Sequence, residues 1–175
     1  MPDEHGLATP ISDTAPCVGC GLCCDGTIYD KARAQPHEVE RMTALGLATL
    51  EDQGKLHFQH PCRFSSEGKC TIYDDRFTIC HTFKCKLLTA YQAGDIGLDE
   101  ARDKIGQALR LRSVVAAEEP AAARHGERRR LLAELAQTSR RVRLQLDIVA
   151  LDFFIDRWFR KDKSAARGSV TIGPD

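Results

Sequence analysis

The chain has 175 residues, with 25 acidic and 25 basic side chains and a pI near 7.0. This balance argues against general electrostatic binding to nucleic acid or to anionic membranes. Apolar residues make up 42% of the chain and aromatic residues only 6%, a composition typical of a globular protein. The unusual number is eight cysteines, all of which lie between Cys17 and Cys85.

The first residues of the chain lack both the basic stretch and the apolar stretch of a secretory signal, so the sequence shows no such signal. No segment reaches the roughly 18 uninterrupted apolar residues that span a membrane. We therefore predict a cytoplasmic protein without a membrane partner. Because cytoplasmic thiols stay reduced, the cysteines are predicted to be metal ligands or redox groups and not disulfides.

Short elements are predicted in the cysteine-rich half of the chain. Pro36 and Gly46 are placed to begin and end a helix, and Gly94 is placed to end another. Alternating apolar residues predict strands, with turn residues just before the second of them. In chain order the predictions are a loose tail at 1–15, a helix at 36–45, strands at 55–59 and 69–73, and a helix at 85–93.

The second half of the chain is predicted to be helical, with a break at Pro120. From Leu98, apolar residues recur at helical spacing. Arginine runs at 128–130 and 140–143 are expected to form a solvated helix face. A later apolar row predicts one long helix, or two broken near Thr138; its members are Leu131, Leu135, Val142, Leu146, Val149, Phe153 and Trp158. We interpret this row as a core face, with a dimer seam as the alternative.

The first cysteine cluster is Cys17-x2-Cys20-x2-Cys23-Cys24. Two cysteines separated by two residues can turn both sulfurs toward one metal, and the glycines between them let the backbone fold back closely. Three cysteines at this spacing match the first three positions of the bacterial ferredoxin run. The fourth cysteine follows at once, so a ferredoxin fold is not implied.

Cys24 directly follows Cys23 and breaks this spacing. Neighbouring side chains of an extended segment point to opposite faces, so these two are not expected to bind one ion together. Either they serve two different sites, or one of them is a spare thiol. The remaining cysteines are spaced irregularly and are predicted to join the first cluster after folding: Cys62, Cys70, Cys80 and Cys85.

All eight cysteines are thus candidate metal ligands. Eight thiolates could build two four-sulfur sites, or one cluster site and a smaller metal site. Tyr73, Arg76 and Tyr29 are polar residues expected near the site, where Tyr73 and Arg76 would surround it without binding metal. A histidine beside a cysteine more often supports a metal site than binds it, so His81 is placed in that surrounding shell, and His60 is a weaker ligand candidate.

These residues resemble the CxxCxxCC (YkgJ-type) cysteine-cluster family of zinc- or iron-chelating domains. The resemblance covers residues 17–88. After its namesake motif that family has one further cysteine and then the run Cys-x-Ile-Tyr-x-x-Arg-Pro-x-x-Cys-Arg-x-Phe-x-Cys. Cys62 and residues 70–85 correspond to these, with every cysteine present. Here Phe77 replaces the proline, and His81 replaces the second arginine. A flagellin lysine N-methylase is similar in its cysteine motif, which implies an iron–sulfur cluster and S-adenosylmethionine.

We therefore predict a mainly helical α+β protein, with an irregular cysteine-rich metal module at 16–92, a helical region at 93–163 packed on it, and a tail at 164–175. The leading hypothesis is a cytoplasmic metal-binding protein that carries an iron–sulfur cluster of the 4Fe–4S type for redox or modification chemistry. One alternative is a structural zinc module for protein–protein interaction. Another, by family analogy alone, is a protein lysine methylase. A protein or redox partner is expected, as is a homodimer through the C-terminal helices if the apolar row is a seam.

Overall fold

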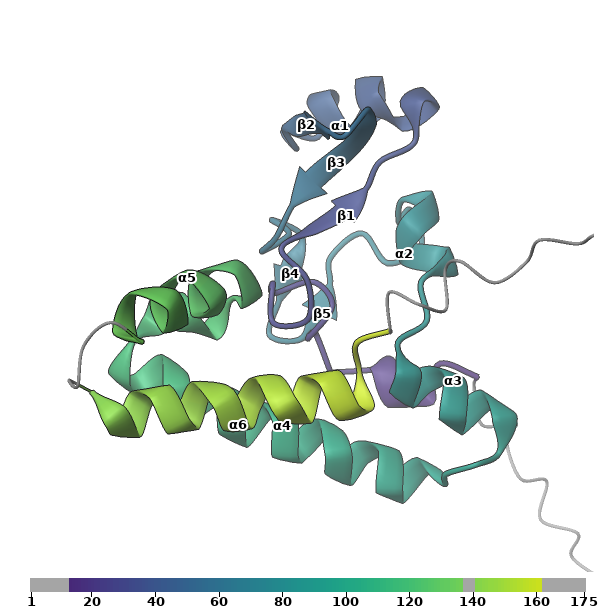
Figure 1. The fold of residues 1–175 in the computed structure, drawn as a ribbon. Helices are drawn as coiled ribbons and strands as arrows, with labels where there is room; N and C mark the ends of the chain where they lie inside the picture. Colours follow the sequence, from purple (N-terminus) through teal and green to yellow (C-terminus); the bar gives the residue numbers. More distant parts are fainter. Residues whose placement is uncertain (1–12, 137–140, 162–175) are drawn as a thin grey trace, which may run out of the picture.

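A computed structural model describes residues 13–136 and 141–161 (Figure 1). The chain is mainly helical, with a cysteine-rich α+β part followed by helices, as the sequence predicts. Most of the predicted tail at 1–15, all of the tail at 164–175 and the predicted break near Thr138 lie outside the described residues.

A small antiparallel sheet with strand order β1-β3-β2 lies at one end of the molecule. Its central strand matches the predicted strand at 55–59, and Phe58 on that strand is fully buried. Phe58 lies opposite Ala32 on one side and Thr49 on the other. The strands are β1 (Lys31–Arg33), β2 (Thr49–Asp52) and β3 (Lys55–Gln59), and the predicted helix at 36–45 forms η2 (Pro36–Glu38) and α1 (Val39–Ala44).

The second predicted strand is shorter than expected. It is the second strand of a small hairpin in which each strand has two residues: β4 (Ser65–Ser66) and β5 (Lys69–Cys70). Glu67 and Gly68 join these strands with positive φ angles of 49° and 74°, the conformation that a tight hairpin turn requires. The strand ends at Cys70 because the chain turns again, where the Asp75 N–H donates to the Ile72 carbonyl.

The helices begin and end close to the predicted residues. α3 (Lys86–Ala93) starts at Cys85, whose Sγ accepts a hydrogen bond from the Leu88 N–H at 3.4 Å, and ends at Gly94 with φ of 78°. None of the helices in the described residues is long and apolar enough to cross a lipid bilayer. The other helical segments are η1 (Ala15–Cys17), α2 (Thr78–Thr82), α4 (Leu98–Glu118), η3 (Pro120–Ala123), α5 (His125–Leu135) and α6 (Val142–Trp158).

Two groups of buried apolar side chains hold the fold together. The smaller one packs α1 and the sheet around Phe58 and Phe77. The larger one joins the loop that carries the first cysteine motif, through Leu22 and Ile28, to α3, α4 and α6. The cysteine-rich part and the helices therefore share one core.

The apolar row predicted as a core face is mostly not in the core. On α6 the buried face is formed by Leu144, Ile148, Leu151 and Ile155. The predicted members on this helix are exposed instead: Val142, Leu146, Val149 and Phe153. The prediction fails because α6 carries apolar residues on two faces, and the sequence pattern alone does not show which of them packs on α4. Leu135 itself is buried as expected.

Candidate metal centre

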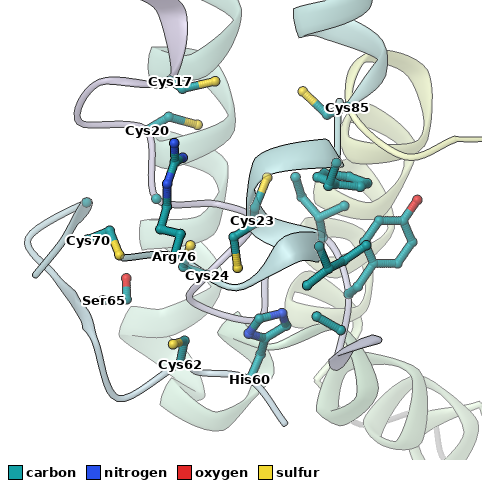
Figure 2. A pocket seen from close by; sticks show the side chains of 18 of the residues that line it. Cys17, Cys20, Cys23, Cys24, His60, Cys62, Ser65, Cys70, Arg76 and Cys85 are labelled. Carbon is teal, nitrogen blue, oxygen red and sulfur yellow. The ribbon is translucent and has the colours of Figure 1, made fainter. Parts of the chain in front are cut away.

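All eight cysteines line one cavity of about 600 Å³. They come from the first motif, from the hairpin region, from α2 and from the start of α3. Figure 2 shows Cys17, Cys20 and Cys85 toward one end of this pocket and Cys62 with His60 toward the other. All eight are free thiols. Folding therefore brings the irregularly spaced cysteines to the first motif, as predicted.

Two glycines allow the first motif to reach the hairpin. Gly21 has φ of 66°, and a Cβ atom added to it would lie 2.7 Å from the Gly68 Cα. A Cβ atom on Gly68 would in turn lie 2.5 Å from the Gly19 carbonyl oxygen. Since real Cβ atoms do not approach backbone so closely, this contact requires glycine on both sides. The contact places the hairpin strand that ends at Cys70 beside the motif.

Charge interactions link the cysteines mostly within two groups of four, and the two groups are linked to each other through Cys23 and Cys24. The first, here called the α3 group because Cys85 caps that helix, consists of Cys17, Cys20, Cys23 and Cys85. The second, the hairpin group, consists of Cys24, Cys62, Cys70 and Cys80. The backbone supports the second group, because the Cys62 N–H donates to the Cys24 carbonyl at 2.7 Å. Cys23 and Cys24 thus fall in different groups, although they lie in a turn, where the Cys24 N–H donates to the Gly21 carbonyl at 2.8 Å, and not in an extended segment.

Burial, and repulsion within each group, raise the pKa values of the thiols. Burial is the larger cause for Cys17, whose pKa rises to about 11, with Cys85 adding to it. The pKa of Cys20 rises to about 12 and that of Cys24 to about 12, again mainly through burial. Without a cation these thiols are neutral at pH 7. A bound metal would displace their protons and supply the missing positive charge.

The donor set fits soft, thiolate-binding metals. Cys sulfur is the preferred ligand of zinc and of iron–sulfur clusters, and four cysteines per group is the usual number for either. As they stand, no three His, Cys, Asp or Glu side chains within 13–136 and 141–161 are placed to hold a single metal ion.

Arg76 lies between the two groups, and its side chain is fixed by Tyr73. Its Nε donates to the Tyr73 carbonyl at 2.8 Å, and its guanidinium lies 3.7 Å from the centre of the Tyr73 ring. Although burial dominates and raises the pKa of both Cys17 and Cys80, the charge of Arg76 lowers each of them. Tyr73 and Arg76 both line the cavity. His81 is exposed on α2 and is not among the lining residues.

His60 has a position that its sequence context only weakly indicated. It lines the cavity, and its ring interacts with the backbone of Cys24, while its buried Nδ1 finds no hydrogen-bond partner in the described part of the chain. Burial lowers the pKa of the imidazole. The sequence feature that indicates a place for His60 near the cysteines is its position directly before Pro61-Cys62.

The helices hold the loop that follows Cys24. The Arg112 Nε donates to the Thr27 hydroxyl at 3.0 Å and pairs with Asp25 at 3.2 Å. The Arg128 guanidinium donates to the Thr27 carbonyl at 2.7 Å and to Asp152 at 2.9 Å. Arg128 is fully buried, so the prediction that its arginine run is a solvated face is wrong for this residue.

One wall of the cavity is apolar. Tyr29 and Phe83 meet edge to face with ring centres 5.8 Å apart, and the Tyr29 hydroxyl accepts a hydrogen bond from the Lys161 N–H. Phe159 and Ile105, from the helical part of the chain, also line the cavity and are buried. Such a wall limits the access of water and lowers the local dielectric constant, which are the conditions under which a protein tunes a metal centre.

One of the comparisons with known proteins found a match. A family model named CxxCxxCC, described as a "putative zinc- or iron-chelating domain", matches residues 16–104, just over half of the chain. No curated protein and no solved structure matched the chain. The matched range contains all eight cysteines together with Tyr73 and Arg76. The chain therefore belongs to the CxxCxxCC family.

Proposed function

We propose that this protein carries two iron–sulfur clusters of the 4Fe–4S type, one on the α3 group and one on the hairpin group, and serves redox chemistry in the cytoplasm. The observation that carries the proposal is the division of eight free thiols, lining one cavity, into two groups of four. Four thiolates are the ligand set of such a cluster. The family description, which names zinc or iron, supports the metal class.

One feature favours iron–sulfur clusters over single zinc ions. The α3 group contains the Cys-x2-Cys-x2-Cys spacing of cluster-binding peptides and completes it with the distant Cys85.

The chain contributes the ligands, their spacing and their surroundings. Each cluster would supply one-electron redox chemistry when bound. Cys23 and Cys24 belong to different groups, so the two centres would be joined by one peptide bond. The guanidinium of Arg76 would offset negative charge on both, and the apolar wall around Tyr29 would limit the access of water to the α3 group. Such an arrangement suits electron transfer to a redox partner.

The proposal is tested by native mass spectrometry of the full chain purified without oxygen, together with iron and sulfide analysis. We expect the mass of two 4Fe–4S clusters and eight atoms each of iron and sulfide, as two clusters of that composition require. Bound zinc without sulfide would overturn the iron–sulfur assignment and favour a structural zinc module. A single cluster would overturn the division into two sites.

Variants test which cysteines share a site. Cys85→Ser is expected to remove the cluster of the α3 group and leave the other, and Cys62→Ser is expected to do the reverse. Ser65→Ala is the matched control, because Ser65 lines the same cavity without a thiol. If both cysteine variants lost the same cluster, the two groups would not be separate sites.

A further inference from the structure

The outer face of α6 carries a continuous row of exposed apolar side chains. We call it the outer row: Val142, Leu146, Val149 and Phe153 are exposed by 53%, 64%, 53% and 73%. The buried row on the same helix is Leu144, Ile148, Leu151 and Ile155. Each outer residue precedes a buried one by two positions, which is about 200° around a helix. The two rows therefore lie on opposite sides of α6.

A helix that is apolar on both sides is normally covered on both sides. The inner side of α6 packs on α4, which runs beside it. Figure 1 shows α6 lying across the helical part of the molecule, with no described element in front of it. Isolated exposed apolar residues are common, but four in one row form a contiguous patch of the kind that marks an interaction site.

We propose that a second copy of this chain covers the outer row, with the two α6 helices packed antiparallel about a twofold axis. The residues of the outer row are separated by four, three and four positions, a spacing that is unchanged when the helix is reversed. It is also the spacing of a helix–helix seam. Reversal about the midpoint places Leu146 opposite Val149 of the second copy and Val142 opposite Phe153.

The side chains suit this antiparallel pairing. Each contact pairs a larger side chain with a smaller one, Leu with Val and Phe with Val, so the spacing of the two helices stays even. A parallel pair would instead set Phe153 against Phe153 and Val142 against Val142, which would splay one end of the helices. A symmetric pair of identical patches is also the commonest arrangement of protein oligomers.

The charges beside the outer row do not oppose the antiparallel pairing. Arg143 flanks the row and is highly exposed, with 85% of its side chain accessible. On the antiparallel helix it lies beside Ala150 of the second copy, because flanking positions on the same side of an antiparallel seam face each other. The Arg143 guanidinium therefore has a small neutral side chain of the second copy as its nearest neighbour across the seam.

The experiment uses the full chain, purified without oxygen, in sedimentation equilibrium. One short seam buries less area than a standard interface, so we expect a dimer with a dissociation constant on the order of micromolar. Leu146→Lys and Val149→Glu are each expected to give monomers, because each places an unpaired charge in the seam. The matched control is Val114→Glu on α4, another half-exposed valine outside the row (44% exposed), which should leave the dimer intact.

The equimolar mixture of the two single variants tests the orientation. In an antiparallel pair the introduced lysine of one chain faces the introduced glutamate of the other, so the mixture should form a heterodimer. In a parallel pair the two charges would not face each other. Circular dichroism and metal content should match the unaltered chain, which shows that lost association is not lost folding.

Three results would overturn the proposal. One is an unaltered chain that stays monomeric up to about 100 µM, which would mean that a different protein, and not a second copy, covers the outer row. Another is a dimer that both single variants retain, which would place the interface elsewhere. The last is a mixture that stays monomeric, which would exclude antiparallel pairing of α6.

Discussion

At the scale of single residues, the charge of Arg76 is shared between two groups of thiols. Its guanidinium stacks on Tyr73 at 3.7 Å and is further held by the Tyr73 carbonyl. It influences Cys17 of the α3 group and Cys80 of the hairpin group. One cation placed in this way stabilises negative charge on both sides of the cavity at once.

Replacing Arg76 with glutamine is expected to lower the reduction potentials of both proposed clusters by tens of millivolts, on the order typical of one nearby charge. A reduced cluster carries more negative charge, so it loses more stabilisation than the oxidised one. Voltammetry of the anaerobic protein measures both potentials. Arg102→Gln, an exposed arginine of α4, is the control. Unchanged potentials in Arg76→Gln would contradict the shared role of this cation.

The raised pKa values of the buried thiols predict how the stability of the metal-free chain depends on pH. Burial raises the pKa of Cys20 and of Cys24 from 9.0 to about 12 each. Between these values the unfolded chain has lost protons that the folded chain keeps. The stabilisation is therefore complete below pH 9 and is lost as the pH rises from 9 through about 12.

Urea unfolding of the metal-free chain should show the free energy of unfolding falling by on the order of 1 kcal/mol per pH unit for each such thiol above pH 9. Metal-loaded protein is the comparison, because ligating thiolates have no proton to lose in this range. Equal stability of the metal-free chain at pH 8 and pH 10 would show that the thiols are not buried as described.

At the scale of elements, Arg128 joins α5 to its neighbours. Its guanidinium donates to Asp152 on α6 and to the carbonyls of Ala123 and Thr27. Although burial alone would raise it, the neighbouring His125 ring together with the hydrogen bonds and charge of Arg128 holds the pKa of Asp152 at about 2. One buried side chain thus connects two helices with the loop after Cys24.

Arg128→Met should destabilise the fold by about 3 to 5 kcal/mol, since it leaves Asp152 buried without its main partner and frees two backbone carbonyls. Chemical denaturation of the metal-loaded protein measures the loss. Arg129→Met is the matched control: Arg129 is the exposed next residue and should change stability by less than about 0.5 kcal/mol. Similar losses in both variants would contradict the structural role of Arg128.

At the scale of the whole molecule, the cysteine-rich part and the helices share a core. Leu22 and Ile28 flank the first motif's last cysteines and are fully buried among side chains of α4 and α6. Cys85 begins α3, whose Leu87 and Leu88 belong to the same buried group. The thiols of the α3 group are therefore held in place by helices that contain no cysteine.

A fragment that ends at residue 95 should consequently fail to unfold cooperatively and should lose the metal of the α3 group, because Leu22 and Ile28 would be exposed to water. Metal analysis and thermal unfolding, compared with the full chain, provide the measurement. If the fragment unfolded cooperatively with full metal content, the cysteine-rich part would be an independent domain.

The sequence predicted those features that depend on neighbouring residues. The helix that begins after Cys85 and ends at Gly94 follows from local capping, and the strand at 55–59 follows from alternation. Strands β1 and β2 were not predicted, because three or four residues carry too little periodicity to be distinguished from a loop. The burial of Arg128 was also missed, because its partners Thr27 and Asp152 are distant in the sequence.

The sequence by itself determined the family and the type of side chain at the candidate site. Eight cysteines and the spacing of the first motif already indicate a thiolate site, because ligand type and short-range geometry are local properties. The tertiary structure alone decided which thiols lie together and which face of α6 is buried. Both depend on contacts between residues far apart in the chain, such as the glycine contact of Gly21 with Gly68, and no local pattern encodes such contacts.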